Sequence, residues 1–495
     1  MADLVDVNVI RGNGTRITYH VSRITRYTIM PRSNFTLALL GLASTLAYVA
    51  ALGLGDLRKN TLSFEITFFA AFLLYLGAVA VVLRPIAFAP SRLTLPLIVL
   101  FAVLFRLVLL PSRPTLSDDM YRYVWDGRVQ AHGLSPYRYP PNAQELAELR
   151  KGDVGVWRYI NRKSFVTVYP PGAQLTYASV WQMVRNSVTG FKAAFVLAEL
   201  AGAWLLVRLL KFFGQPPERV LIYLWSPLLI FEVAHAGHVD GVMLPLLILA
   251  LWARLKEQPW LLGLSLGAAT LVKLFPLILL PALLPWAWSR KGLAQSARLL
   301  LSFSGIVAAA YAFYWVYDPG VLGFLPFYFN ENFNLGLARV LFGLADQWHV
   351  ARSTLANAVT FGGLIGLSVL FILRPAATGK AALVRCVWLI GWFTLFTQNL
   401  FPWYLLWLLP FIPLFVEPGA VLGLKLAPMS AWLVFSGTVA MAYMFFVNWR
   451  VIPWAQAAEF WPLYALLLVP AAGFWPRLSW RMERKKAYGS RATTS

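Results

Sequence analysis

Long apolar runs recur along almost the whole chain, and they constrain its fold more than any other feature. Five of them cover residues 35–54, 63–83, 191–210, 422–447 and 461–475. An α-helix needs about 20 apolar residues to cross the hydrocarbon core of a bilayer, whereas the strands of a membrane barrel are shorter and alternate in polarity. With 59% hydrophobic and 13% charged residues, the 495-residue chain has too little polar surface for a water-soluble globule. The sequence therefore predicts an all-α, polytopic membrane protein.

Clusters of basic residues predict how the chain is oriented in its membrane. Five arginines precede the first apolar run, and six Arg or Lys residues lie between 477 and 491. Loops rich in Arg and Lys stay in the cytoplasm, so we expect both termini there and an even number of spans between them. The first run has no small-residue cleavage site and is expected to be a signal anchor. Helices are expected near residues 34–54, 63–83, 94–110, 190–211, 219–236, 241–254, 259–274, 275–289, 295–316, 352–373, 382–398, 401–416, 422–446 and 457–474, which is about 13 to 14 transmembrane helices.

The same pattern divides the chain into five parts. These are a basic cytoplasmic N-terminus (1–33), N-terminal transmembrane helices (34–110), a first large outer loop with juxtamembrane helices (111–189), a transmembrane core (190–474) and a basic cytoplasmic tail (475–495). Residues 172–186 are mainly apolar but carry Gln174, Thr176, Ser179 and Gln182, and a span there would break the even count. We expect an interfacial helix at that position. The net charge of +22 is assigned to cytoplasmic loops rather than to nucleic-acid binding, because no polar domain carries a basic stripe.

The outer loop contains a dense group of charges. In "LSDDMYRYVWDGRVQAHGLSPY", residues 116–137, five charged side chains fall within eleven positions. Ser117 is expected to cap a helix whose first turn holds Asp118 and Asp119, and Gly133 followed by Pro136 is expected to end it.

The two acids of this helix have two interpretations. In one, Asp118 and Asp119 only interact favourably with the helix dipole. In the other, Asp119, Arg122 or Tyr123, and Asp126 share one helical face directed above the outer leaflet. An ionised aspartate beside a cation is suited to act as a general base on a hydroxyl group. The spacing does not decide which of the two acids is the base.

Further polar groups lie at the ends of predicted helices. The turn "HAGHVDG" covers residues 235–241, and "FNENFN" and "QNLFPWY" cover 329–334 and 398–404. Each is compatible with a polar or aromatic turn at the membrane surface as well as with a binding site. Lys273 lies in an apolar segment, where a lysine must either extend to water or pair with an anion such as a phosphate.

The residue types also limit the expected cofactors. Cys386 is the single cysteine, so a multi-cysteine metal site and an intramolecular disulfide are ruled out. A zinc site is not expected, because no spaced histidine pair accompanies the acids. An oxygen-ligated divalent ion stays open, although two adjacent aspartates are weak evidence for one. The sequence has neither a P-loop nor a dinucleotide-binding glycine motif. No cofactor is expected.

Several segments in order resemble a known family. They are "SDDMYRYVWDGRVQAHGLSPY", "VYPPGAQ", "SPLLIFEVAHAGHVDGVMLPLLILAL", "LGAATLVKLFPLILLP" and "FPWYLLWLLPF", which fall within residues 94–416. Together they are similar to the integral-membrane glycosyltransferases of the GT-C fold that use polyprenyl-phosphate sugars, in the mannosyltransferase-like branch. The resemblance implies an enzyme of the plasma (inner) membrane with an outer-face site that transfers a sugar, most often mannose, with inversion. The acceptor would be a glycolipid, a glycan or a protein hydroxyl.

The resemblance assigns expected roles to Asp118 or Asp119, Asp240 and Lys273, and the chemistry of the other residues named above adds further expected contacts. The catalytic acid is expected at Asp118 or Asp119. Contacts to the phosphate or sugar of the lipid-linked substrate are expected from Arg122, Asp126, Arg128, Tyr137, Arg138, His235, His238, Asp240 and Lys273. Contacts to the acceptor or to lipid are expected from Tyr169, Asn332, Asn334, Gln398, Trp403 and Tyr404. The helices near 34–54 and 63–83 precede the family's usual core, and their role is not predicted.

Two other functions are compatible with the membrane pattern. A transporter or flippase usually places coupled charges at the bilayer midplane and shows two similar halves. Here the ionisable residues gather at the outer loops and no half-repeat is visible. An O-antigen ligase or polymerase would show an Arg-rich late outer loop, for which Arg339, Arg352 and Arg450 are the candidates.

Overall fold

Helices make up nearly all the regular structure of the described residues. The computed structural model describes residues 4–10, 16–22, 32–84, 90–152, 155–284, 290–316, 318–323, 325, 331–417 and 428–468. The predicted all-α class is confirmed. A short antiparallel hairpin of β1 (Leu4–Ile10) and β2 (Arg16–Ser22), paired from Leu4–Ser22 to Ile10–Arg16, was not predicted. The predicted cytoplasmic tail, 475–495, lies outside the described residues.

The long helices have the following bounds: α1 Arg32–Gly53, α2 Thr61–Leu83, α3 Thr94–Leu109, α4 Asp119–Ala131, α6 Pro171–Val184, α7 Val188–Phe212, α10 Asp240–Leu255, α11 Pro259–Val272, α13 Arg290–Trp315, α15 Ala338–Gln347, α16 Arg352–Leu373, α17 Gly379–Phe396, α19 Pro428–Thr438 and α21 Pro453–Leu468. The short pieces are η1 Gln144–Leu146, α5 Ala147–Lys151, η2 Trp157–Tyr159, η3 Pro217–Val220, α8 Leu221–Leu224, α9 Pro227–Ile230, η4 Phe231–His235, η5 Phe275–Leu279, α12 Leu280–Leu283, η6 Pro402–Trp407, α18 Ile412–Phe415, η7 Val439–Met444 and α20 Phe445–Asn448.

Within the described residues, seven helices are long and apolar enough to cross a membrane. They are Ser33–Gly53, Thr61–Leu83, Val188–Phe212, Arg290–Trp315, Arg352–Leu373, Gly379–Phe396 and Met429–Asn448. Two shorter apolar helices are Thr94–Leu109 and Pro259–Val272. The chain is therefore a multi-pass membrane protein. The segment predicted to be an interfacial helix forms α6, a 14-residue helix that packs on α4 and α11.

Three segments expected to be single helices are instead broken into short pieces. They are 219–236, 275–289 and 401–416, of which 285–289 lies outside the described residues. Each contains or adjoins prolines, and proline removes a backbone hydrogen bond and clashes with the preceding turn. Such breaks are tolerated at membrane depth where other helices surround them. Residues 219–236 are buried along their length.

A buried ion pair joins two of the long helices. Arg106 on α3 donates from Nε to Glu199 Oε2 on α7 at 2.7 Å and from Nη2 to Oε1 at 3.1 Å, and both side chains are buried. Arg106 also donates to the carbonyl oxygen of Leu224 at 3.0 Å. Nearby, Lys192 on α7 donates to the carbonyl oxygen of Ser112 at 2.6 Å. These contacts fix the chain where it leaves α3 toward α4.

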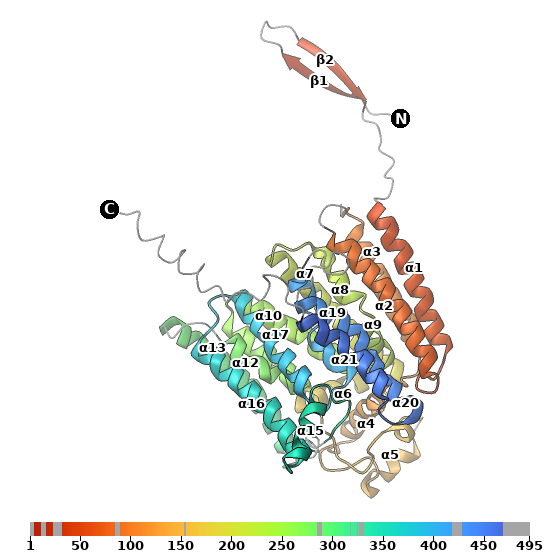
Figure 1. The fold of residues 1–495 in the computed structure, drawn as a ribbon, viewed down its shortest axis with the longest axis vertical. Coiled ribbons are helices and arrows are strands. Elements are labelled where there is room, and N and C mark those ends of the chain that lie inside the picture. Colours follow the sequence, from red (N-terminus) through yellow and green to blue (C-terminus); the bar gives the residue numbers. More distant parts are fainter. Residues whose placement is uncertain are drawn as a thin grey trace.

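The helices run side by side, and α4, α5, α15 and α20 lie at one end of the molecule (Figure 1). The turn between α1 and α2, the residues after α11 and the loop between α17 and η6 reach the same end, because they line one cavity with the start of α4. Segments far apart in the sequence therefore meet there.

Candidate active site

A cavity of about 700 Å³ lies against the start of α4. One part of its wall is polar and contains Arg58, Ser117, Asp118, Asp119, Arg122, Asn161, Arg162, Lys273, Glu331, Asn357, Thr360, Thr397, Gln398 and Asn399. The rest is mainly apolar or aromatic and contains Leu116, Phe165, Val166, Val168, Tyr169, Pro170, Leu274, Phe275, Leu277, Ile278, Leu325, Phe361, Phe393, Phe401, Trp403, Tyr404 and Trp407. A mostly apolar cavity with a few convergent polar groups is typical of a ligand site.

The predicted helix at 116–137 is present but begins later than expected. Its first residue is Asp119, Asp118 is in the capping position, and Asp118 makes no side-chain capping bond. Ser117 Oγ accepts from the backbone N–H of Asp119 at 3.3 Å. Gly133 ends the helix as predicted, with a φ of +74° that favours glycine. Both acids therefore lie at the start of the helix, where the helix dipole favours them, and neither the capping nor the dipole distinguishes one from the other.

Asp118 is paired with a residue that the sequence did not point to. Arg58, in the turn between α1 and α2, donates from Nη1 to Oδ2 at 3.3 Å and from Nη2 to Oδ1 at 3.1 Å. The guanidinium of Arg58 also lies 4.7 Å from the ring centre of Phe446. The first two helices thus supply a cation to the cavity. No local pattern marks this pair, because its members are 60 residues apart.

Asp119 has weaker neighbours than Asp118. Asn161 donates from Nδ2 to Asp119 Oδ1 at 3.4 Å, and His238 Nδ1 lies 3.9 Å from Asp119 Oδ2. In the part of the chain that the structure describes, no Arg or Lys nitrogen is within 4.0 Å of this carboxylate. Its side chain is 25% exposed and lines the cavity.

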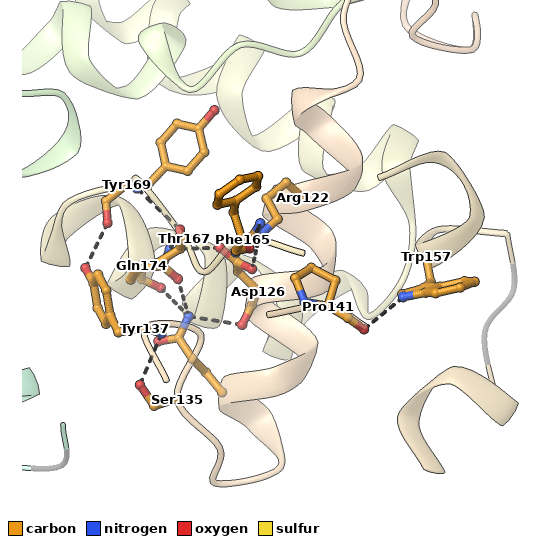
Figure 2. Close-up of polar contacts among 11 residues, drawn as sticks. Arg122, Asp126, Ser135, Tyr137, Pro141, Trp157, Phe165, Thr167, Tyr169 and Gln174 are labelled. Carbon is orange, nitrogen blue, oxygen red and sulfur yellow. Dashed lines mark hydrogen bonds and ion pairs between the residues drawn. The ribbon is translucent and has the colours of Figure 1, made fainter. Parts of the chain in front are cut away.

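Asp126 does not join Asp119 in an acidic row facing the cavity, and the expectation that it would is wrong. Asp126 Oδ1 accepts from Arg122 Nε at 2.7 Å, and Oδ2 accepts from Gln174 Nε2 at 3.0 Å (Figure 2). Arg122 Nη1 also donates to the carbonyl oxygen of Phe165 at 3.0 Å. Two turns after Asp119, the same face of α4 is covered by residues 165–174, and Asp126 is therefore only 1% exposed. Of the pair Arg122 and Asp126, only Arg122 lines the cavity.

The two histidines of the "HAGHVDG" turn have different positions. His235 Nδ1 is 2.8 Å from Ser112 Oγ, and its Nε2 accepts from the backbone N–H of Thr115 at 3.3 Å. It therefore holds the segment before α4 rather than lining the cavity. His238 is buried beside Asp119, and its Nε2 lies 3.3 Å from Glu232 Oε2.

Asp240 and Lys273, both expected to contact the phosphate or sugar of the substrate, form one ion pair. Lys273 Nζ donates to Asp240 Oδ2 at 2.5 Å, and Trp407 Nε1 donates to Asp240 Oδ1 at 2.8 Å. Asp240 is fully buried, whereas Lys273 lines the cavity. Of the two arrangements expected for Lys273, the structure shows pairing with an anion, and Asp240 supplies that anion.

The remaining predicted residues separate into two groups. Tyr169, Gln398, Trp403 and Tyr404 line the cavity. Arg128, Tyr137, Arg138, Asn332 and Asn334 lie outside its lining. Tyr137 supports the site instead, because its hydroxyl donates to the carbonyl oxygen of Tyr169 at 2.8 Å (Figure 2). Asn334 is buried and donates to Glu459 Oε1 at 2.6 Å.

Sequence reasoning missed several polar residues of the cavity. These are Arg58, Asn161, Asn399 and the ion pair of Arg162 with Glu331. Arg58 and Asn161 stand alone in loops and give no local signal of function, whereas Glu331 and Asn399 lie in the segments 329–334 and 398–404, in which other residues were selected. The described residues contain no group of three His, Cys, Asp or Glu side chains arranged to hold a metal ion.

Aromatic packing keeps α4 in place against α6. The ring of Tyr123 stacks on Tyr177 with centres 4.6 Å apart and planes 12° apart, and it meets Tyr169 edge-on at 5.0 Å. Burial raises the pKa of Tyr123 well above its ordinary value, and the nearby Asp119 carboxylate raises it further. The phenol therefore stays protonated next to the acid.

The chain matches a known protein family over part of its length. Residues 37–290, just over half of the chain, match the family described as alpha-(1->6)-mannopyranosyltransferase, N-terminal domain. The chain belongs to this family. The match confirms the resemblance to the mannosyltransferase-like branch, and it includes α4, the "HAGHVDG" turn and Lys273.

Individual relatives match over shorter segments. GPI mannosyltransferase 1 of Aspergillus oryzae is 29% identical over 128 residues, which is 24% of this chain and 31% of that protein. GPI mannosyltransferase 1 of Aspergillus fumigatus is 29% identical over 119 residues, which is 23% of this chain and 28% of that protein. The matched part spans under a third of the length of these curated relatives. No solved structure matches the chain.

Proposed function

We propose that this protein transfers a mannosyl group from a polyprenyl-phosphate donor to a hydroxyl group of a lipid, glycan or protein, with Asp119 as the general base. The observation that carries the proposal is the pairing of charges at the cavity. Asp118 and Glu331 are held by arginines, whereas Asp119 faces the cavity beside an amide and an imidazole. The family and both relatives are mannosyltransferases by name, which supports the choice of sugar.

The proposed reaction is a direct displacement. Asp119 removes the proton from the acceptor hydroxyl while that oxygen attacks the anomeric carbon, and the bond from this carbon to the phosphate oxygen breaks. The leaving group departs as polyprenyl phosphate, and the proton stays on Asp119 until it passes to water. Such a displacement inverts the anomeric centre, so an α-linked product of the kind in the family's name requires a β-linked donor.

Lys273 is the proposed contact to the phosphate of the donor. It lines the cavity directly before the apolar wall formed by Leu274, Phe275, Leu277 and Ile278. A lipid-linked phosphate needs a cation at its charged end and an apolar surface along its chain, and this junction offers both. Arg122 lines the polar side of the same cavity and is available as a second cation.

The cavity is proposed to open on the outer face of the plasma membrane, with both termini in the cytoplasm. The support comes from three helices with one end on the side of the site. The helix α10 starts at Asp240, the partner of Lys273, α17 ends directly before Thr397 of the cavity lining, and Tyr314 near the end of α13 donates to Gln130 on α4. Basic residues stand at the end of α10 (Lys256), the start of α13 (Arg290) and the start of α17 (Lys380). Such clusters favour the cytoplasmic side.

The test is a transfer assay on the purified full-length protein in lipid discs. Polyprenyl-phosphate mannose and a membrane lipid extract are supplied, and released polyprenyl phosphate and mannosylated products are measured by mass spectrometry. We expect release by the unchanged protein and a loss of about 10²–10⁴-fold in kcat for Asp119→Asn, the range typical of a general base. Asp118→Asn should lose much less, because Asp118 is held by Arg58.

Two results would contradict the proposal. Full activity of a correctly inserted Asp119→Asn protein would exclude Asp119 as the base. Absence of release with any lipid-linked sugar would favour a transporter or flippase instead.

A further inference from the structure

Asn399 is buried at the cavity wall with its amide unpaired. The residue lies in the loop between α17 and η6, is 8% exposed and lines the cavity. Among the residues that the structure describes, neither Oδ1 nor Nδ2 has a hydrogen-bond partner. Removing an amide from water without a new partner costs folding free energy, so buried amides are nearly always paired. An unpaired amide at the wall of a cavity points to a ligand that supplies the missing partner.

The backbone around Asn399 is held firmly, in contrast to its side chain. The N–H of Phe333 donates to the carbonyl oxygen of Gln398 at 3.0 Å, and the N–H of Leu400 donates to the carbonyl oxygen of Phe333 at 2.9 Å. The N–H of Asn399 itself donates to Thr397 Oγ1 at 3.3 Å. The loop is therefore positioned before any ligand binds, which lowers the entropy cost of binding.

Aromatic rings connect this loop to the proposed base. Phe401 stacks on Trp403 with ring centres 4.4 Å apart and planes 6° apart. Trp403 in turn stacks on His238 at 4.1 Å, and His238 is the neighbour of Asp119. Aromatic faces with an amide beside them suit a sugar ring, because its C–H groups pack on the rings and its hydroxyls need hydrogen bonds.

The other end of the same segment reaches the proposed phosphate contact. Trp407 donates to Asp240, which holds Lys273. Residues 398–407 therefore extend from the proposed phosphate contact to the neighbourhood of Asp119. The sugar to be transferred lies between the phosphate and the acceptor hydroxyl in the proposed reaction, and thus along this segment.

We propose that Asn399 is a specificity-determining residue that hydrogen-bonds a ring hydroxyl of the transferred sugar. The inference rests on the proposed function. A buried amide that hydrogen-bonds one hydroxyl of the sugar disfavours a sugar with the opposite configuration at that carbon, because the amide then stays unpaired. The residue would thus distinguish hexoses that differ at one carbon.

The test compares lipid-linked sugars in the transfer assay. Polyprenyl-phosphate mannose is set against its glucose and galactose counterparts, using the full-length protein and three variants. Asn399→Ala removes the amide, Asn399→Leu keeps its shape but removes both the N–H donors and the oxygen acceptor, and Asn448→Ala is the matched control on an exposed residue outside the cavity lining. For Asn399→Ala we expect kcat/KM with the preferred sugar to fall about tenfold or more and the ratio between sugars to shrink. Asn448→Ala should behave like the unchanged protein.

The outcomes separate this inference from the proposed function. An active unchanged protein whose sugar ratio survives in Asn399→Ala would overturn the inference and leave the function standing. If Asn399→Ala does not fold, Asn399→Leu decides in the same way, because it has neither donor nor acceptor, and an unchanged ratio there means that the amide has only a structural role. An unchanged protein that is inactive with all three sugars would overturn the proposed function itself.

Discussion

Asp118 and Asp119 are adjacent in the chain but have different partners in the structure. Arg58 holds Asp118 with two hydrogen bonds, whereas Asp119 meets Asn161 and His238. Spacing alone left the choice between them open, because both acids fall in one turn. Asp119 is proposed as the base because Arg58, from another part of the sequence, holds Asp118.

Lys273 provides a prediction at the residue scale. Replacing both members of its ion pair, as Lys273→Met with Asp240→Asn, removes the cation without leaving a buried charge unpaired. We expect the KM for the lipid-linked donor to rise about tenfold, with a smaller effect on kcat, because the lost contact is to the phosphate.

Lys273→Arg is the matched control and should keep a donor KM near that of the unchanged protein. Thermal unfolding checks that each variant is folded. A donor KM that does not change in the neutral pair would mean that Lys273 serves only to balance Asp240.

The contact between α4 and α6 decides where the proposed base sits. Gly127 faces α6 so closely that an added Cβ would lie 2.5 Å from the carbonyl oxygen of Tyr177 and 2.9 Å from Trp181 Cβ. Because a backbone atom has little room to move, a side chain at this position would push α4 away from α6. The stacked rings of Tyr123 and Tyr177 would then separate.

This contact gives a prediction at the scale of elements. Gly127→Ala should lower the free energy of unfolding by about 1–3 kcal/mol, as overpacking does, and reduce kcat by displacing the start of α4. Gly343→Ala on α15 is the control, because nothing lies within 4 Å of its added Cβ, and it should be neutral or stabilising. Thermal unfolding and the transfer assay measure both effects. Equal stability of the two variants would show that α4 tolerates a wider spacing.

The single cysteine makes the orientation of the whole molecule testable. Because Cys386 is the single cysteine of the sequence, Cys386→Ser gives a background without cysteine. Asn332 is exposed beside the cavity-lining Glu331, and Lys256 is exposed after α10, whose 16 residues begin at Asp240 and extend about 24 Å.

We expect a membrane-impermeant maleimide to label Asn332→Cys in intact cells and Lys256→Cys only after the membrane is opened. This result would place the cavity on the outer face and agree with the distribution of basic residues. The reverse pattern would place the cavity on the cytoplasmic side and contradict the proposed topology.

Much of the fold was predictable from local sequence. The long apolar helices, the end of α4 just before Gly133 and the polar turns at helix ends follow from residues that are neighbours in the chain. The broken segments at 219–236 and 401–416 were not predicted as broken. Their prolines interrupt the helix, but only surrounding helices make the interruption tolerable.

The sequence by itself determined the membrane class, the helical elements and the stretch that contains the proposed base, because hydrophobicity and helix-end signals act between near neighbours. Only the tertiary structure decided which charges are paired. It brought Arg58 to Asp118, joined Asp240 to Lys273 and turned Asp126 away from the cavity. It also placed the unpaired amide of Asn399 at the cavity wall. These outcomes depend on contacts between residues far apart in the chain, and an ion pair or hydrogen bond forms only where packing brings its two members within reach.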